Sequence, residues 1–467
     1  MIKIIFLALS FSVLISCSTP GQKEKITDAS NILTLADSFP AGQIISNVFA
    51  KNETSLSYSL FLPSGYSSTK KWPLLILFDA QTRGTLPLEL YKTVAEHNGF
   101  ILMCSNDSRN GNPPELTEKI IASMLSEGTT RFSTHNDMIF TGGFSGGARI
   151  AALCAMQNQN IKGVIGVSAG FPTNQFPNRP FRFIGIAGKD DFNYKELIEL
   201  DNQLLQLNYP HFLFIHNGKH DWCPAELINN AMLLLASDAM RDKTIPINKK
   251  MLEENKQSNL EEAKQLMAAH HYTDAKIILN FILECNKGLD ATDDVSKELS
   301  KLVQSKAFQK QEKELNELLK TENTQLQSFV QSIGKPINWW QEEVNKIRAK
   351  ISAVPESEYS YMLKRVLGGV SIQCYMYAQH FVNTSETANA AYIVELYKLV
   401  DPENKDPWFF SAALNARNGK NEAAINDLYT SITNGFTDTN RLLNDVAFQS
   451  LLTQPSFSEL LAKIPAR

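Results

Sequence analysis

The sequence predicts two structural parts: a mostly parallel α/β sheet covered by helices on both faces, and then an all-helical region. Short apolar runs such as residues 74–78 and 100–104 are typical of strands buried on both faces. Up to about residue 241 such runs alternate with helix-like segments, as in parallel strands joined by crossover helices. Beyond residue 249 glycine becomes scarce and apolar residues recur every three or four positions, which indicates helices.

The elements of the first part follow from these patterns in chain order. Residues 43–49 and 55–62 alternate as strands do, and a Pro-Ser-Gly-Tyr turn ends the second run. Further strands are expected at residues 74–78, 100–104, 138–140, 163–167, 183–187 and 212–215, with helices at 86–96, 113–128, 150–156, 194–207 and 224–240. The carboxyl ends of parallel strands meet at one edge of a sheet, so a functional site is expected in the loops that follow them.

The length of 467 residues exceeds one ordinary core, so two folded domains are expected. We predict a signal segment at residues 1–17, a tether at 18–40, an α/β domain at 41–245 and a helical domain at 250–467. Hydrophobic residues make up 43% of the chain and charged residues 20%, as in a globular protein. The net charge of −4 leaves no basic excess for a nucleic-acid partner.

The N-terminus has the features of an export signal. Lys3 precedes an apolar run at residues 4–15, which is too short for an ordinary membrane span. Leu14-Ile-Ser-Cys17 resembles the lipobox of bacterial lipoproteins, which implies that Cys17 is lipidated and becomes the first residue of the mature chain. The implied location is the bacterial cell envelope, lipid-anchored and extracytoplasmic. A cleaved secretory signal with an incidental cysteine is the alternative.

The remaining cysteines and histidines predict no metal and no cofactor. The spacing of the five cysteines after Cys17 fits neither a disulfide framework nor a metal clip, and one bridge between Cys285 and Cys374 stays open. The adjacent pair His270 and His271 lacks the i, i+4 spacing of a helical metal site.

The segment at residues 138–156 has the pattern strand, Gly-x-Ser-x-Gly, helix. Its centre is Gly143-Phe-Ser-Gly-Gly147, between the apolar end of a strand and a run spaced like a buried helix. This context predicts a nucleophile elbow, a turn so tight that only glycine fits at positions 143 and 147. Ser145 would then lie in a strained conformation, with its hydroxyl raised at the start of a helix.

Two later strand ends carry the acid and the base that such a serine needs. Residues 183–187 lead into Gly188-Lys-Asp-Asp191, and residues 212–215 lead into His216-Asn-Gly-Lys-His-Asp-Trp222. The order serine, aspartate, histidine, each after its own strand, suits a triad. In a triad the imidazole takes the serine proton and the carboxylate holds the imidazole.

Residues from about 43 to 241 resemble the α/β-hydrolase superfamily, in particular its secreted esterases of the feruloyl-esterase and polyhydroxybutyrate-depolymerase kind. The resemblance is carried by Tyr58-Ser-Leu-Phe-Leu-Pro63 before Gly65-Tyr66, together with the elbow and the two loops just described. It implies the α/β-hydrolase fold and hydrolysis of carboxylic esters at Ser145.

The family pattern also selects among neighbouring candidates. Its spacing Gly-x-x-Asp matches Asp191 rather than Asp190, and its Gly-x-His matches His220. His216 lies at the strand end and is a candidate for packing, whereas His211 precedes its strand and lies at the wrong end of the sheet.

An oxyanion hole needs two backbone N–H groups. One is that of Gly146, directly after the nucleophile, and the other comes from the loop after residues 74–78. Relatives usually have His-Gly-x there, whereas this chain has Asp79-Ala-Gln81. By position Gln81 supplies the second N–H, with Ala80 as the alternative.

Two segments of the helical region resemble tetratricopeptide-type helix pairs. They are residues 268–275 with Leu279, and residues 413–419 with Glu422-Ala-Ala424 and Leu428. No period of about 34 residues connects them, so we predict a degenerate array. Such an array could bind a protein partner, gate the substrate, or pack on the hydrolase and stabilise it.

These patterns together predict a serine hydrolase, specifically a carboxylesterase that acts through an acyl-enzyme on a small ester or an acylated polymer. A serine peptidase or amidase of the prolyl-oligopeptidase type would use the same residues and is the alternative among enzymes. Outside enzymes, the alternative is a non-catalytic binding lipoprotein that uses its helical array.

Overall fold

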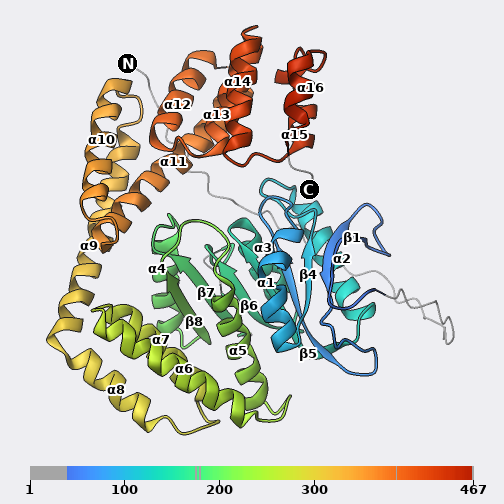
Figure 1. Ribbon diagram of the computed structural model, residues 1–467, viewed down its shortest axis with the longest axis vertical. Coiled ribbons are helices and arrows are strands. Elements are labelled where there is room, and N and C mark those ends of the chain that lie inside the picture. The colour runs from blue at the N-terminus through green and yellow to red at the C-terminus, as the bar shows by residue number, and fades with distance from the viewer. Residues whose placement is uncertain (1–38, 174–175, 178–179, 385, 465–467) are drawn as a thin grey trace, which may run out of the picture. The chain divides into compact units, whose positions relative to one another are not determined.

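The computed structural model describes residues 39–173, 176–177, 180–384 and 386–464 (Figure 1). Cys17, the lipobox and most of the predicted tether lie outside these residues. Ala41–Arg467 form one compact unit. Within the described residues, no helix combines the length and the apolar character that crossing a membrane requires.

The first part of this unit is built on a sheet of eight strands in the described residues, in the order β1-β2-β4-β3-β5-β6-β7-β8. Strands β1 and β2 pair antiparallel, β2 pairs antiparallel with β4, and all later pairings are parallel. The strands are β1 Ile44–Phe49, β2 Ser57–Phe61, β3 Trp72–Phe78, β4 Ile101–Ser105, β5 Thr134–Phe144, β6 Ile161–Val167, β7 Arg182–Gly188 and β8 His211–His216.

Helices cover both faces of this sheet. Helices α1 and α5 contact each other over one face, whereas α2 and α3 share the other face with α4. The central strands β3 to β7 are therefore buried on both sides, which explains why they appear in the sequence as continuous apolar runs. The helices are α1 Thr85–Asn98, α2 Pro114–Thr130, α3 Gly146–Gln157, α4 Tyr194–Gln206 and α5 Ala225–Arg241.

This arrangement confirms the predicted fold class: an α/β-hydrolase fold followed by an all-helical region. Every predicted strand and helix of the first part is present. The helices of the second part are α6 Lys249–Ala268, α7 Tyr272–Asn286, α8 Asp293–Gln304, α9 Lys306–Gln331, α10 Ile337–Ala353, α11 Glu358–Thr384, α12 Thr387–Val400, α13 Lys405–Arg417, α14 Asn421–Thr433, α15 Thr439–Asn444 and α16 Pro455–Leu461, with a 3-10 turn η1 at Val446–Phe448.

The first helices of the second part share the core of the sheet. The ring of Phe281 on α7 lies 5.3 Å from Phe214 and 6.0 Å from Phe212 of β8, measured between centroids. Phe281 and Cys285 belong to the same buried cluster as the strands. Helix α7 therefore packs as part of the α/β core although it follows the predicted domain boundary.

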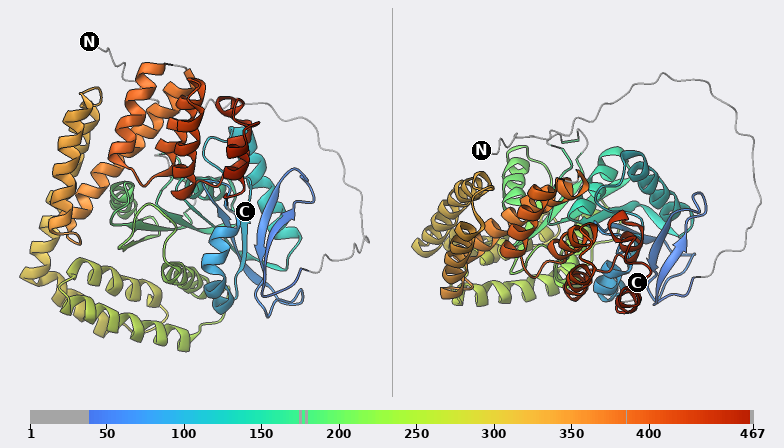
Figure 2. Two further views of the ribbon diagram at one scale, coloured as in Figure 1. Left: turned by 45° about the horizontal axis from the view of Figure 1, so that its top comes forward. Right: turned by 90° about the horizontal axis from the view of Figure 1, so that it is seen from above.

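The later helices have a core of their own. Trp340, Phe409 and Phe448 are almost fully buried in it, and they come from α10, α13 and η1. Helices α11 and α13 lie over the edge of the sheet at which the parallel strands end, as the views in Figures 1 and 2 agree. This edge is where a functional site was expected.

The two segments that resemble tetratricopeptide pairs fall at turns between packed helices. One spans the junction of α6 and α7, and the other the junction of α13 and α14. Ala263, Ala275, Ala413 and Ala424 are buried where these helices approach each other. Two of the helices between them are much longer, with 26 residues in α9 and 27 in α11, so the described residues show no regular repeat.

The cysteines in the described residues are all free and buried. The bridge left open between Cys285 and Cys374 is not formed. The two residues lie in different clusters, one in the core shared with the sheet and one in the core of the later helices.

Candidate active site

Ser145 lies at the junction of β5 and α3 in a strained backbone conformation, with φ 55° and ψ −120°. A Cβ atom on Gly147 would lie 2.0 Å from the carbonyl oxygen of Phe78, and one on Gly143 would lie 2.3 Å from the backbone of Gly147. Both glycines are therefore required by the closeness of the neighbouring backbone. The predicted tight turn with a strained serine is confirmed.

The loops after β5, β7 and β8 bring three side chains into one hydrogen-bonded chain. The Ser145 Oγ lies 3.0 Å from Nε2 of His220, and Nδ1 of His220 lies 2.8 Å from Oδ1 of Asp191. A carboxylate only accepts, so Nδ1–H is the donor and Nε2 is left to accept the serine proton. The same Oδ1 also accepts the N–H of Asn193 at 2.8 Å.

Burial makes this arrangement electrostatically strong. The Asp191 side chain is fully buried, whereas 20% of the His220 side chain is exposed. The imidazole is therefore reachable from solvent on one side while the carboxylate beneath it is shielded from water. A hydroxyl so placed next to a held imidazole can be deprotonated as it attacks an electrophile.

The rival residues have other partners. Asp190 Oδ2 accepts from Lys364 at 2.9 Å, and the ring of His211 lies 3.2 Å from Asp201. His216 is half-buried beside Gly218, and no described residue bonds to its Nδ1. Burial lowers the pKa of His216 below its ordinary value, which keeps this ring neutral.

Two aromatic rings hold the imidazole of His220 in place. The Phe192 ring lies 4.1 Å from it with an interplanar angle of 31°, and the Phe144 ring lies 4.8 Å from it. Sequence reasoning did not identify these residues as part of the site. Both directly adjoin predicted site residues in the chain, which is the one signal that could have found them.

Asp79, the first residue after β3, is fully buried beside the site. Its carboxylate accepts from Arg83 Nη2 at 2.9 Å, from the N–H of Gln81 at 2.8 Å and from the indole N–H of Trp222 at 2.9 Å. Burial opposes its ionisation, but these donors, Arg83 above all, hold the pKa of Asp79 below its ordinary value. Asp79 thereby connects the loop after β3 to the loop that carries His220.

This bonding changes the expectation for the oxyanion hole. The Gln81 N–H is turned toward the Asp79 side chain, because a short aspartate can accept from the backbone two residues later. Within the described part of the chain, no hydrogen bond engages the N–H of Ala80 or that of Gly146. Of the two residues considered after β3, Ala80 is therefore the one whose N–H is free.

The loop after β4 adds a residue that sequence reasoning missed. The Asn110 N–H donates to the Ala80 carbonyl at 2.9 Å, and its side-chain amide occupies the space beside Gly146. A Cβ on Gly146 would lie only 1.8 Å from Asn110 Oδ1. Asn110 therefore places a polar group next to the residue that follows the nucleophile, and nothing local in the sequence announces it.

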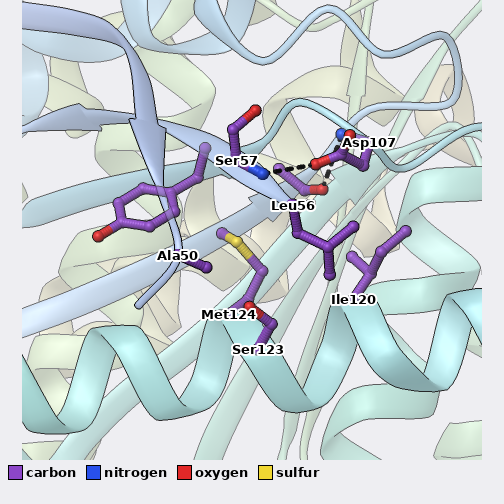
Figure 3. Close-up of a pocket in the computed structure, with 9 residues that line it drawn as sticks. Ala50, Leu56, Ser57, Asp107, Ile120, Ser123 and Met124 are labelled. Carbon is purple, nitrogen blue, oxygen red and sulfur yellow. Dashed lines mark hydrogen bonds between the residues drawn. The ribbon is translucent and has the colours of Figure 1, made fainter. Parts of the chain in front are cut away.

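The start of the loop after β4 is held by a hydrogen bond from β2. The N–H of Ser57 donates to Asp107 Oδ2 at 2.8 Å, at the rim of the small hollow shown in Figure 3. That hollow, lined in part by Leu56 and Met124, is too small for a water molecule and is not a ligand site.

A much larger hollow, of about 1530 Å³, lies between β8, α4, α7 and α9. Neither Ser145 nor His220 lines it. Several charges on its walls are paired with each other, as Lys276 is with Glu312 at 2.8 Å. In the described residues, no group of three or more His, Cys, Asp or Glu side chains could hold a metal ion.

No family model matches the chain, and no curated protein matches it. Similar solved structures include S-formylglutathione hydrolase FrmB from Staphylococcus aureus, which is 15% identical with a TM-score of 0.36 over 42% of this chain and 97% of that one. The feruloyl esterase module from Clostridium thermocellum is 14% identical with a TM-score of 0.35, over 41% and 87%. Dipeptidyl peptidase 4 from Porphyromonas gingivalis is 13% identical with a TM-score of 0.33, over 41% and 35%. Likenesses this distant leave the chemistry to be inferred from the side chains of this chain.

Proposed function

We propose that this protein is a serine hydrolase, specifically a carboxylesterase that works through an acyl-enzyme. The observation that carries the proposal is the continuous hydrogen-bonded chain from Ser145 through His220 to Asp191, with contacts of 3.0 and 2.8 Å. A strained turn that raises the serine at the start of α3 supports it further.

In the proposed reaction, Ser145 Oγ attacks the acyl carbon of an ester while His220 Nε2 takes its proton. The imidazolium then gives this proton to the departing alcohol, and the acyl group stays on the serine oxygen. A water molecule, deprotonated by the same nitrogen, then attacks the acyl carbon. The bond from this carbon to Ser145 Oγ breaks, the acid is released, and the imidazolium returns the proton to Oγ. Asp191 stabilises the imidazolium and fixes which nitrogen carries the proton.

The negative charge that develops on the acyl oxygen needs donors that are already in place. We assign one to the N–H of Gly146, which lies at the positive end of α3. The Ala80 N–H is the second candidate, because the Gln81 N–H is held by Asp79. Gln81 could serve only if Asp79 released it.

The proposed substrate is a small ester or an acylated polymer outside the cytoplasm. Location is inferred from Leu14-Ile-Ser-Cys17 alone, since a lipidated Cys17 would anchor the chain to an envelope membrane. No nucleic-acid partner is proposed, whereas a protein partner of the helical region is compatible with its packed helix pairs.

The proposal is tested by treating purified protein with a fluorophosphonate probe. Wild type and Ser300→Ala, which alters an exposed serine on α8, should be labelled, whereas Ser145→Ala should not. A folded wild type that takes no label would instead favour a binding lipoprotein. Labelling of Ser145→Ala equal to wild type would exclude this serine as the nucleophile.

Substrate class is tested next with nitrophenyl esters of short and long acyl chains and with dipeptide anilides. A carboxylesterase should cleave the esters much faster than the anilides. Faster cleavage of the anilides would favour the peptidase or amidase alternative, which uses the same three side chains.

A further inference from the structure

The loop that carries Asp191, residues 188–194, is held by the helical region as well as by its own sheet. On the sheet side, the Lys189 N–H donates at 2.8 Å to the His216 carbonyl at the end of β8, and the Asp190 N–H donates at 2.8 Å to the Gly218 carbonyl in the loop after it. On the other side, the Lys189 ammonium lies 2.8 Å from Asp274 of α7 and 3.0 Å from Glu358 of α11. Lys189 is almost fully buried, so its ammonium is shielded from water, although the Asp274 and Glu358 side chains are 21% and 26% exposed.

Helix α11 contacts this loop through residues on one of its faces. Lys364 bonds to Asp190 at 2.9 Å, directly before Asp191 in the chain. One turn later, Gly368 lets the helix approach Phe192, since a Cβ there would lie 3.3 Å from the Cβ of Phe192. The helix thus touches the residues on both sides of Asp191, and one of them, Phe192, packs its ring against His220.

Arg365 makes the most buried of these contacts. Its Nη1 donates to the Lys189 carbonyl at 2.6 Å, and its guanidinium lies 4.4 Å from the centre of the Tyr194 ring. It therefore contacts both ends of the loop. The Arg365 side chain is 1% exposed, so its position is set by protein contacts rather than by water.

A second helix holds Arg365 in that position. Glu322 of α9 accepts from Arg365 Nη2 at 2.6 Å and from Nε at 3.0 Å. This forked pairing leaves Nη1 aimed at the loop, because the planar guanidinium has a rigid geometry. A lysine at this position could not satisfy the carboxylate and the carbonyl in the same way.

We propose that Arg365 is a positioning residue for the Asp191 carboxylate, so that the helical region is a working part of the active site. This inference rests on the proposed hydrolase function. Its physical basis is that a misplacement of about 1 Å at a reacting group can cost roughly 100-fold in rate. Arg365 touches no substrate and acts through the loop alone.

The test removes the whole buried pair at once, because a lone buried charge would destabilise the fold. The double variant Arg365→Met/Glu322→Met keeps volume and leaves no unpaired charge, an exchange that is often neutral for stability. Arg348→Met is the matched control. Arg348 also donates to backbone carbonyls within the helical region, those of Leu399 and Val400, but none of its hydrogen bonds reaches the loop.

Two readouts are compared, and the first does not depend on activity. Hydrogen–deuterium exchange of residues 188–194 should be at least about tenfold faster in the double variant than in Arg348→Met. In ester hydrolysis, kcat should fall by roughly 10- to 100-fold with KM nearly unchanged.

Exchange and kcat within twofold of the control would overturn the proposal. If the double variant does not fold, Arg365→Lys gives the same comparison, since it keeps a charge beside Glu322 but loses the fork. A wild type that neither labels nor hydrolyses would refute the proposed function, while the exchange measurement would still decide whether Arg365 holds the loop.

Discussion

Asp79 offers the sharpest test of how the site is held, because one buried carboxylate joins two of its loops. We expect Asp79→Asn to lower the free energy of unfolding by about 2–4 kcal/mol at pH 7. The change keeps the shape of the side chain but removes its charge and turns one acceptor into a donor. Five N–H donors, from Gln81, Arg83 and Trp222, then face a single amide oxygen.

The size of this stability loss depends on whether each N–H donor can bind water or another acceptor once the carboxylate is gone. Trp222 is 7% exposed, so an indole N–H left without an acceptor costs about 1–3 kcal/mol. Arg83 is 25% exposed and can rehydrate, which keeps the loss below the roughly 3–5 kcal/mol of a fully buried broken pair. The remaining loss comes from replacing charge-assisted bonds by neutral ones.

The pH dependence has a definite sign. The folded state lowers the pKa of Asp79, so its contribution to stability is complete above the unfolded value of about 3.9 and is lost as pH falls through the folded value. The difference between wild type and Asp79→Asn should therefore be the same at pH 7 and pH 5, and should shrink below about pH 4.

Urea unfolding followed by tryptophan fluorescence measures both effects. Asp137→Asn is the matched control, because Asp137 pairs with Lys162 at 3.1 Å but is 58% exposed, and should change stability by less than about 0.5 kcal/mol. A change of that small size for Asp79→Asn at pH 7 would refute the reasoning, as would a difference from wild type that grows on acidification.

Three further outcomes are expected. In Asp191→Asn, kcat should fall on the order of 10⁴-fold, because the amide no longer fixes the imidazole tautomer. An ester assay measures this loss, and urea unfolding checks that the variant keeps its fold. Gly147→Ala should destabilise the fold by about 3 kcal/mol, since the new Cβ atom would meet the Phe78 backbone, which cannot move. Gly146→Ala should cost much less, because its Cβ atom would meet the exposed Asn110 side chain, which can rotate away. Equal unfolding midpoints for these two variants would contradict the elbow geometry. Burial raises the pKa of four thiols, those of Cys154, Cys223, Cys285 and Cys374, to about 12. A thiol reagent at pH 8 should therefore label them only after the protein has been unfolded. Rapid labelling of the native protein would contradict their buried positions.

The helical region is more closely joined to the α/β part than its position in the chain suggests. Phe281 packs on β8, Arg365 holds the loop of Asp191, and the Lys405 ammonium donates to the Gln81 side chain at 2.8 Å. Helices α7, α11 and α13 thus reach the core and two loops around the site. We therefore favour a role in shaping or gating the site over a separate appendage.

The sequence by itself determined the strands, the helices and the turn at Ser145, because local periodicity and glycine spacing encode them. It also indicated which loops carry Ser145, Asp191 and His220, since the topology of a parallel sheet brings the ends of its strands to one edge. The roles of these residues stay predictions until the probe experiment is done.

Only the tertiary structure decided which polar groups surround that edge. The Arg365 contact to Lys189 joins positions 176 apart in the chain, and the Trp222 bond to Asp79 joins positions 143 apart. Neither pair follows from a periodic pattern, because such contacts depend on how completed elements pack. The partner of the Gln81 N–H was also decided by the tertiary structure. Its position in the chain assigned this N–H to the oxyanion hole, but it donates to the Asp79 side chain two residues earlier. Asp79 is fully buried and has no water to bind, so its carboxylate needs donors from the protein.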